Sequence, residues 1–241
     1  FELDDNNALD PEYVEALKKE YTGLWYQRYI LRLWVLAEGV IYQMFDESLH
    51  VKPPESSERL IRYAVSVDYG THNPCVFGLF GIGIVDNTAY MVKEYYYDSI
   101  KSGRQKTDQE YASDLRDFIG GYPVEAVIVD PSALSFITEL KKWRKQGMPR
   151  VMPAINDVLP GIQQVSWMLN NHRLYIHPRC KNTIREFGAY VWDDKAVLRG
   201  EDKPKKESDH CQDMLRYYCS TWWKKGKGPN IDDAKGYGGI N

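Results

Sequence analysis

Three consecutive strand-like runs, followed by a regular alternation of helices and short strands, constrain the fold of this chain more than any other feature. The runs at 60–70, 75–85 and 89–97 are apolar, rich in β-formers and closely spaced, which predicts three antiparallel strands. Helical patterns then alternate with short strand-like runs at 124–130, 150–153 and 173–177. The helical patterns cover 107–119, 134–146, 157–171, 181–190 and 208–223, and 190–193 with 196–199 predicts a hairpin. This order predicts an α/β fold, a mixed β-sheet with helices on both faces.

The polar, proline-containing segment 52–58 (KPPESSE) predicts a domain boundary. We therefore expect residues 1–58 to form a helical N-terminal linker or appendage and residues 59–223 to form the main domain. Residues 224–241 are rich in glycine and lack apolar periodicity, which predicts a flexible tail. Because the chain starts at Phe1 and not at Met, we expect it to be a fragment of a longer protein.

Composition excludes some classes of protein and leaves others open. The 31 basic and 34 acidic residues nearly balance, so net charge does not indicate a nucleic-acid-binding protein, although a local basic face remains compatible with it. The four cysteines form neither a zinc signature nor a clear disulfide framework, which favours an intracellular, reducing location. No apolar run has the length of a membrane span, so we expect no membrane association.

Two aspartates end apolar strand-like runs. Asp68 closes the first run and is followed by Tyr69-Gly70, and Asp130 closes VIVD, just before Pro131. The carboxyl ends of strands are where α/β sheets place their ligands, so both carboxylates are candidates for one site. Two structural alternatives stay open: Asp68 as a turn residue, and Asp130 as the cap of the helix that follows.

A third acidic feature is the start of the last helix, Ser208-Asp-His-Cys-Gln-Asp213. Asp209 and Asp213 are four residues apart, so they share a helix face and repel each other by a few tenths of a kcal/mol, a cost that a bound cation would offset. Alternatively, Asp209 benefits from the helix dipole and Asp213 lies on a solvated face. His210 is an outer metal ligand, a proton carrier or a hydrogen-bonding residue of the first turn.

Carboxylates gathered in this way predict a metal site. Oxygen ligands suit Mg²⁺ or Mn²⁺, and two such ions about 3.5–4 Å apart activate a water and stabilise the leaving oxygen of a phosphodiester. We expect catalysis by a set of five residues, with all but Asp209 as metal ligands. The set is Asp68, Asp130, Asp209, His210 and Asp213.

The charged segment 192–206 (WDDKAVLRGEDKPKK) lies just before the third acidic feature. Five of its side chains are candidates for contacts with DNA phosphates. They are Lys195, Arg199, Lys203, Lys205 and Lys206. The acids between them keep the alternative of a solvated charged loop open.

Taken together, these motifs resemble the nuclease domain of the large terminase subunit of tailed bacteriophages. The matching segments are VSVDYGTHNPCVFGLFGI, VIVDPSA and SDHCQDMLRYY, and the N-terminal stretch LDPEYVEALKKEYTGLWYQRYILRLWVLAEGVIYQMF resembles the segment that joins the terminase motor to its nuclease. The resemblance runs from about Leu9 to Trp223 and implies a ribonuclease H-like fold and two divalent metals. Asp68 and Asp130 would be core ligands, Asp213 the third acid, and Asp209 and His210 would lie close by.

The resemblance also implies a role and partners. The role would be endonucleolytic cleavage of double-stranded viral DNA concatemers during genome packaging, in the host cytoplasm. The terminase small subunit and the portal or procapsid would be partners. The sequence holds no GxxxxGK[ST] phosphate-binding motif, so we expect no ATPase motor in this chain and a low affinity for DNA.

Two alternatives of other kinds stay open. One is a different enzyme of the same fold, such as a resolvase, an integrase-like transferase or an exonuclease, which would select branched DNA or free ends. The other is a non-catalytic module that docks on the portal or procapsid and in which the acids are structural.

Overall fold

The computed structural model describes residues 36–55, 58–85 and 87–223, together with the single positions 10, 12, 15, 18, 26 and 27. The predicted tail at 224–241 and most of the predicted helical appendage lie outside the described residues.

A six-stranded mixed sheet forms the centre of the molecule, with strand order β5-β4-β1-β2-β3-β6. The first three strands are antiparallel neighbours, whereas β4 runs parallel to β1, β5 parallel to β4, and β6 parallel to β3. The strands are β1 (Leu60–Asp68), β2 (Cys75–Gly83), β3 (Ala89–Tyr97), β4 (Val124–Val129), β5 (Arg150–Pro153) and β6 (Leu174–Ile176). The predicted antiparallel start and the mixed sheet are confirmed.

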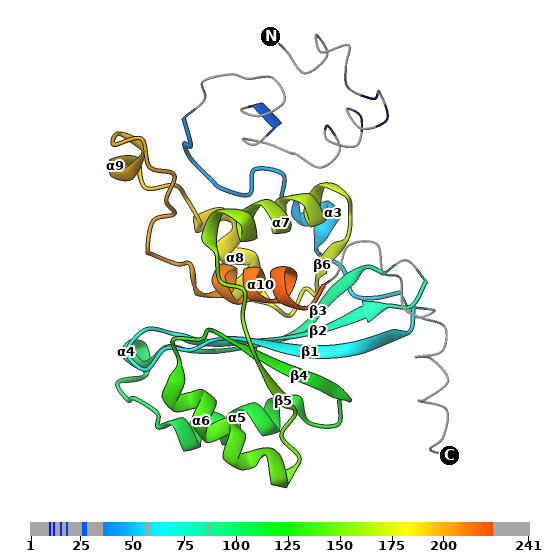
Figure 1. Ribbon diagram of the computed structural model, residues 1–241, viewed down its shortest axis with the longest axis vertical. Helices are drawn as coiled ribbons and strands as arrows, with labels where there is room; N and C mark the ends of the chain where they lie inside the picture. The colour runs from blue at the N-terminus through cyan, green and yellow to red at the C-terminus, as the bar shows by residue number, and fades with distance from the viewer. Residues whose placement is uncertain are drawn as a thin grey trace.

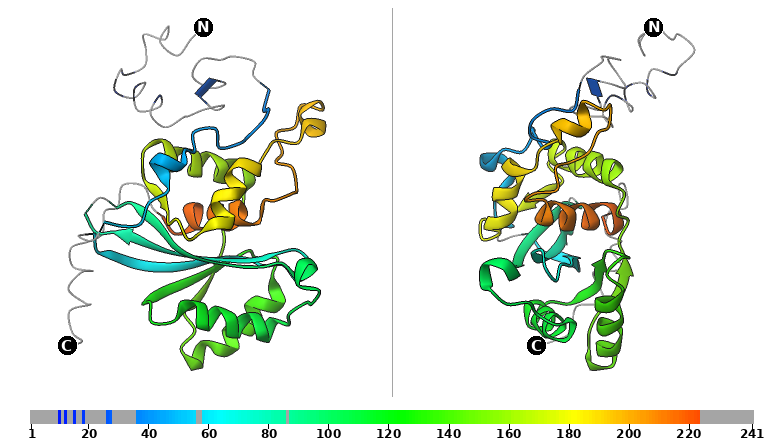
Figure 2. Two further views of the ribbon diagram at one scale, coloured as in Figure 1. Left: turned by 180° about the vertical axis from the view of Figure 1, so that it is seen from behind. Right: turned by 90° about the vertical axis from the view of Figure 1, so that its left-hand side faces the viewer.

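Helices cover both faces of this sheet, as predicted (Figures 1 and 2). The described helices are α3 (Glu47–His50), α4 (Ser99–Ser102), α5 (Asp108–Ile119), α6 (Leu134–Lys142), the 3₁₀ helix η3 (Trp143–Gln146), α7 (Val158–Asn170), α8 (Lys181–Ala189), α9 (Asp194–Val197) and α10 (His210–Thr221). One face carries α5 and α6, and the other carries α10 with α7 and α8 beyond it. Each face of the sheet has its own hydrophobic core, and alternate residues of a strand contribute to one core or the other, because successive side chains point to opposite faces.

Helix α10 is the central element of the larger core. It lies between the sheet and the outer helices, and residues 211–219 are all buried, so it presents almost no polar face to solvent. The Ser66 hydroxyl of β1 donates to the Met214 carbonyl at 2.7 Å, and the rings of Phe80 and Tyr218 stack with centroids 3.8 Å apart. These contacts hold α10 across β1 and β2.

Part of the segment that we assigned to the appendage packs into this same core. Ala37, Ile41 and Tyr42 are buried against it, and Val51 forms an isolated bridge with Ile176 of β6. The boundary near residue 58 stays a prediction, but Ala37, Ile41 and Tyr42 share a core with α8 and α10.

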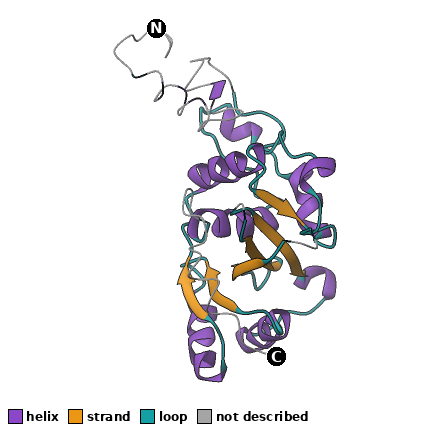
Figure 3. Cartoon of the chain, turned by 90° about the vertical axis from the view of Figure 1, so that its right-hand side faces the viewer, coloured by secondary structure: helices purple, strands orange, loops and turns teal. Residues whose placement is uncertain are grey.

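The predicted hairpin of 190–193 and 196–199 is wrong. Residues 194–197 form the short helix α9, because the Asp193 carboxylate caps it by accepting from the Lys195 and Ala196 amides. The extended residues before it pair elsewhere, Val191 with Val40 and Trp192 with Pro204. The segment thus leaves the body as a loop with one helical turn and returns at α10 (Figure 1). Figure 3 shows the strands in the middle of the molecule with helices around them.

The four cysteines are free and buried, in agreement with the absence of a disulfide framework. Within the described part of the chain, no helix is long and apolar enough to cross a membrane.

Candidate active site

The register of β1 and β4 brings the two strand-end aspartates to one edge of the sheet. Val67 pairs with Val129 in the parallel ladder, so Asp68 and Asp130 each follow a paired residue. Ser66, two residues before Asp68, bonds to α10, and Ile128, two residues before Asp130, packs in the core that contains α10. Because side chains alternate along a strand, both carboxylates belong to the α10 face.

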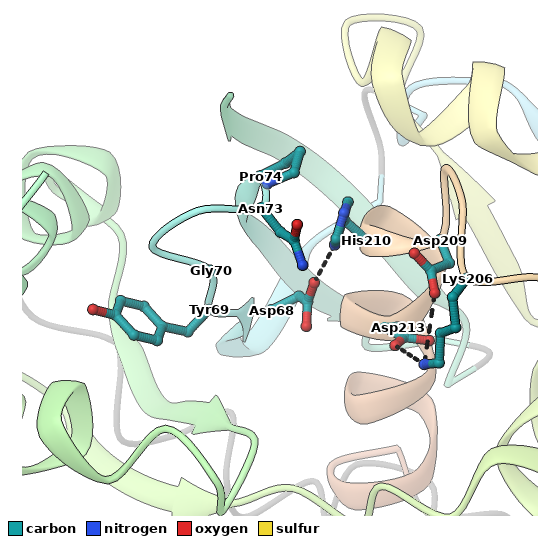
Figure 4. A pocket seen from close by; sticks show the side chains of 9 residues that line it. All are labelled: Asp68, Tyr69, Gly70, Asn73, Pro74, Lys206, Asp209, His210 and Asp213. Atoms are coloured by element: carbon teal, nitrogen blue, oxygen red, sulfur yellow. Dashed lines mark hydrogen bonds and ion pairs between the residues drawn. The ribbon is translucent and has the colours of Figure 1, made fainter. Parts of the chain in front are cut away.

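A pocket of about 240 Å³ opens beside the end of β1 (Figure 4). Its walls come from the loop after β1 and from the start of α10, which are far apart in the sequence. The lining residues are Asp68, Tyr69, Gly70, Asn73, Pro74, Lys206, Asp209, His210 and Asp213. Five of the predicted site residues therefore surround one cavity.

Asp68 and His210 form the contact between the two walls. Nδ1 of His210 lies 3.0 Å from Oδ2 of Asp68, and both side chains are largely buried (Figure 4). Burial raises the pKa of the Asp68 carboxyl to about 6, the hydrogen bond with His210 opposes this rise, and the negative charge of Asp213 adds to it. Burial on its own would lower the pKa of His210, but the bond to Asp68 outweighs it and the pKa is raised.

The start of α10 supplies the other two acids of the pocket. Ser208 has a left-handed backbone (φ 51°), a conformation that a non-glycine residue rarely adopts. Asp209 follows it as the N-cap residue, yet its side chain caps no amide, so the carboxylate is left to the pocket. Asp213, one turn later, is only 9% exposed, so the interpretation that it lies on a solvated face is wrong. Burial raises the pKa of Asp209, and the Asp213 charge adds to this.

Asp130 does not line the pocket but lies on the adjacent strand. Its Oδ1 accepts from the Ser132 amide at 2.7 Å and its Oδ2 from the Asn156 side chain at 3.0 Å. Helix α6 starts without a side-chain cap, so Asp130 forms a turn and does not cap that helix. Burial by itself would raise the pKa of this carboxyl, but the hydrogen bonds from Ser132 and Asn156 lower it.

Tyr217 connects Asp130 to the pocket acids and has no role in the sequence-based prediction. Burial raises the pKa of its hydroxyl strongly, and the negative charges of Asp68, Asp213 and Asp130 raise it further. This side chain is therefore near all three acids. Its position four residues after Asp213, on the same helix face, was the available signal in the sequence.

Protein cations partner the acids in this structure. The Lys206 ammonium lies 3.6 Å from Asp209 Oδ2 and 3.9 Å from Asp213 Oδ2, and Arg216 binds Asp213 at 2.7 Å (Figure 4 shows the lysine). In the described part of the chain, no group of three or more His, Cys, Asp or Glu side chains is close enough together to hold a metal ion. The donor chemistry nevertheless fits a divalent cation, because three carboxylates line one cavity and the charge of Asp213 raises the pKa of both Asp68 and Asp209.

The other basic candidates lie on the segment that carries α9. Arg199 and Lys203 pair with Glu201, and Lys205 pairs with Glu207 at 2.7 Å. These local pairs agree with the solvated-loop interpretation for those three residues. Lys206 differs, because its side chain lines the pocket while remaining 76% exposed.

No family model matches this sequence. Solved nuclease domains of large terminases nevertheless share its fold. The domain from bacteriophage SPP1, with bound Mn, is 20% identical, with a TM-score of 0.52 over 76% of this chain and 97% of that one. The domain from thermophilic phage G20c, with bound magnesium, is 11% identical, with a TM-score of 0.54 over 77% of this chain and 98% of that one. The chain thus has the ribonuclease H-like fold of these nuclease domains.

Two proteins that are about twice as long as this chain are similar to it in sequence. The large terminase of a thermophilic bacteriophage, solved in complex with ADP, is 48% identical, with a TM-score of 0.82 over 92% of this chain and 54% of that one. The terminase large subunit of Escherichia phage T5 is 21% identical over 225 residues, which cover 88% of this chain and 49% of that protein. The chain is a homologue of phage terminase large subunits and spans about half the length of these relatives.

Proposed function

We propose that this chain is a divalent-metal-dependent endonuclease that cleaves double-stranded viral DNA during genome packaging. The observation that carries the proposal is the pocket in which Asp68 from β1 meets Asp209, His210 and Asp213 from α10. Asp130, at the end of the neighbouring strand, supplies a further carboxylate at the same edge. Homology to terminase large subunits and the nuclease-domain fold support this chemistry.

Asp68, Asp130, Asp213 and His210 are the proposed metal ligands, with Asp209 beside them. The use of Mg²⁺ or Mn²⁺ is supported by the similar domains that hold those ions and by the oxygen-rich donor set. Two ions bound here would activate a water and stabilise the leaving oxygen of the phosphodiester.

The residues around the acids have proposed roles of their own. Asp68 orients His210 through the 3.0 Å contact, which leaves the other ring nitrogen of His210 available to a metal ion. Lys206 would be free to contact a phosphate if a metal ion took the place of its ammonium beside Asp209 and Asp213. Lys195 of α9 extends the contact with the DNA backbone, whereas Arg199, Lys203 and Lys205 keep their pairs with Glu201 and Glu207. The small terminase subunit and the portal or procapsid are the proposed protein partners.

The direct test is cleavage of supercoiled plasmid by the purified chain in Mn²⁺. We expect nicking followed by linearisation, complete inhibition by a chelator, and a loss of more than ~100-fold in Asp68→Asn and Asp130→Asn. Activity that survives chelation would disprove the metal mechanism.

A matched control comes from the opposite face of the sheet. Asp117 of α5 is an exposed carboxylate far from the pocket, so Asp117→Asn removes the same charge without touching the site. It should cleave like the wild type. Strong preference for four-way junctions or for free ends would instead favour a resolvase or an exonuclease.

A further inference from the structure

Arg216 is a fully buried guanidinium on α10, one turn after Asp213. Its Nη2 donates to Asp213 Oδ1 at 2.7 Å, and its Nε lies 3.3 Å from the same oxygen. The other oxygen, Oδ2, remains on the pocket side, where Lys206 approaches it. Arg216 therefore fixes the rotamer of Asp213 and leaves one carboxylate oxygen available to the pocket.

The other end of the guanidinium binds the loop between β5 and α7. Nη1 donates to the carbonyls of Asn156 at 3.2 Å and Asp157 at 3.1 Å. The side chain of Asn156 in turn donates to Asp130 Oδ2 at 3.0 Å. An unbroken series of contacts thus runs from Asp213 through Arg216 and Asn156 to Asp130.

The residues packed around Arg216 leave just enough room for its side chain. Gly161 of α7 faces it, and a Cβ at that position would lie 3.2 Å from both Cδ and Nη1 of the arginine. A lysine could not replace the guanidinium, because a single ammonium cannot bind a carboxylate on one side and two carbonyls on the other. The site requires the planar, multiply donating group that is present.

We propose that Arg216 and Asn156 are positioning residues that fix the separation between Asp130 and Asp213 for metal binding. The inference depends on the proposed function, since it assigns these two acids to one metal site. The two residues touch neither metal nor substrate and act through the carboxylates that they hold.

Asn156→Ala is the decisive variant, because it removes the donor to Asp130 and keeps the backbone carbonyl that Arg216 binds. Calorimetric titration with Mn²⁺ should show a dissociation constant raised by about 10- to 100-fold. Its melting temperature should stay within about 2 °C of wild type, and saturating Mn²⁺ should restore most of the nicking rate. Ile155→Ala, on the same loop and half exposed, is the matched control and should bind Mn²⁺ like the wild type.

Arg216→Lys should lower Mn²⁺ affinity as well and should also lower the melting temperature, because the arginine is buried. If that variant does not fold, Asn156→Ala alone decides the question. If Asn156→Ala binds Mn²⁺ with wild-type affinity, the inference is overturned, whether or not cleavage is affected. If the wild type binds Mn²⁺ but does not nick DNA, the proposed nuclease activity is disproved. The positioning role of Arg216 and Asn156 is then decided by the Mn²⁺ affinities alone. A wild type that does not bind Mn²⁺ would overturn both.

Discussion

Asp68 at the end of β1 and His210 at the start of α10 are 142 residues apart in the sequence and meet at 3.0 Å. The contact joins the two walls of the pocket, and Ser66 and Met214 join the same two elements at 2.7 Å, further along the strand and the helix. Contacts within the chain itself therefore hold the strand end and the helix start together. Asp68 is buried close to the negative charges of Asp213 and Asp209, which raise its pKa.

Asp68→Asn should raise stability while it removes activity. Burial raises the pKa of this carboxyl to about 6, so the folded state binds its proton more tightly than the unfolded state, where the pKa is about 3.9. The corresponding stability is fully present below about pH 4 and is lost as the pH rises through 6. In chelator at pH 8, thermal melts should show the variant more stable than wild type, by on the order of 2 kcal/mol.

The difference between the two proteins should shrink as the pH falls from 7 toward 4, because the wild-type carboxyl then becomes neutral as well. Asp117→Asn, which changes an exposed carboxyl of α5 on the opposite face of the sheet, is the control for removal of a carboxylate charge. An Asp68→Asn protein that is less stable than wild type at every pH would contradict the argument.

Mn²⁺ should stabilise the fold, and a chelator should reverse the effect. A cation that binds among the acids of the folded state alone adds about 2.7 kcal/mol at one hundred times its dissociation constant. Differential scanning fluorimetry should therefore show a melting temperature that rises with Mn²⁺ concentration. Asp213→Asn should largely lose this rise, because it removes a proposed ligand. An equal rise in wild type and variant would point to binding elsewhere on the molecule.

Lys206→Ala should weaken DNA binding, whereas Lys205→Ala should have little effect. The two lysines are neighbours of equal charge, but Lys206 lines the pocket and Lys205 pairs with Glu207 at 2.7 Å. Loss of one phosphate contact reduces the dependence of log affinity on log salt by about one unit. Fluorescence anisotropy with a short duplex over a range of salt concentrations, in Ca²⁺ to suppress cleavage, measures this slope. Equal effects of the two substitutions would contradict a specific role for Lys206.

Gly78→Ala should destabilise the protein through the position of α10. A Cβ on Gly78 would lie 2.3 Å from Sδ of Met214, the residue next to Asp213, and 2.8 Å from the Phe80 ring. Overpacking of this kind costs about 1–3 kcal/mol. Urea denaturation should show the loss, and Gly121→Ala, where a Cβ meets nothing within 4 Å, is the control. A Gly78→Ala protein of wild-type stability would mean that Met214 moves aside without cost.

Local pattern was sufficient to predict most of the elements. The strands at 89–97 and 150–153 agree with the structure residue for residue, and the main helix boundaries differ by one or two residues. These segments have clear periodicity and well-marked turns at their ends. The hairpin near residue 196 failed because the Asp193 cap and the distant partners Val40 and Pro204 determine that segment.

The acids were predictable as candidates, because each stands at the end of a strand or at the start of a helix. Asp68, Asp209, His210 and Asp213 do line one pocket, while Asp130 lies beside it on the next strand. Tyr217 received no role although it lies four residues after Asp213, and Asn156 received none because nothing near it in the sequence shows that it approaches Asp130.

Local sequence specifies where the elements begin and end and which residue types stand there, since strand and helix propensity and turn chemistry act over a few neighbouring residues. The tertiary fold places α10 across β1 and β2, so that carboxylates from distant segments become buried together and Asp68 acquires His210 as its partner. Burial depends on separation in space. The parallel register of β1 with β4 and the packing of α10 on β1 set that separation between residues far apart in the sequence.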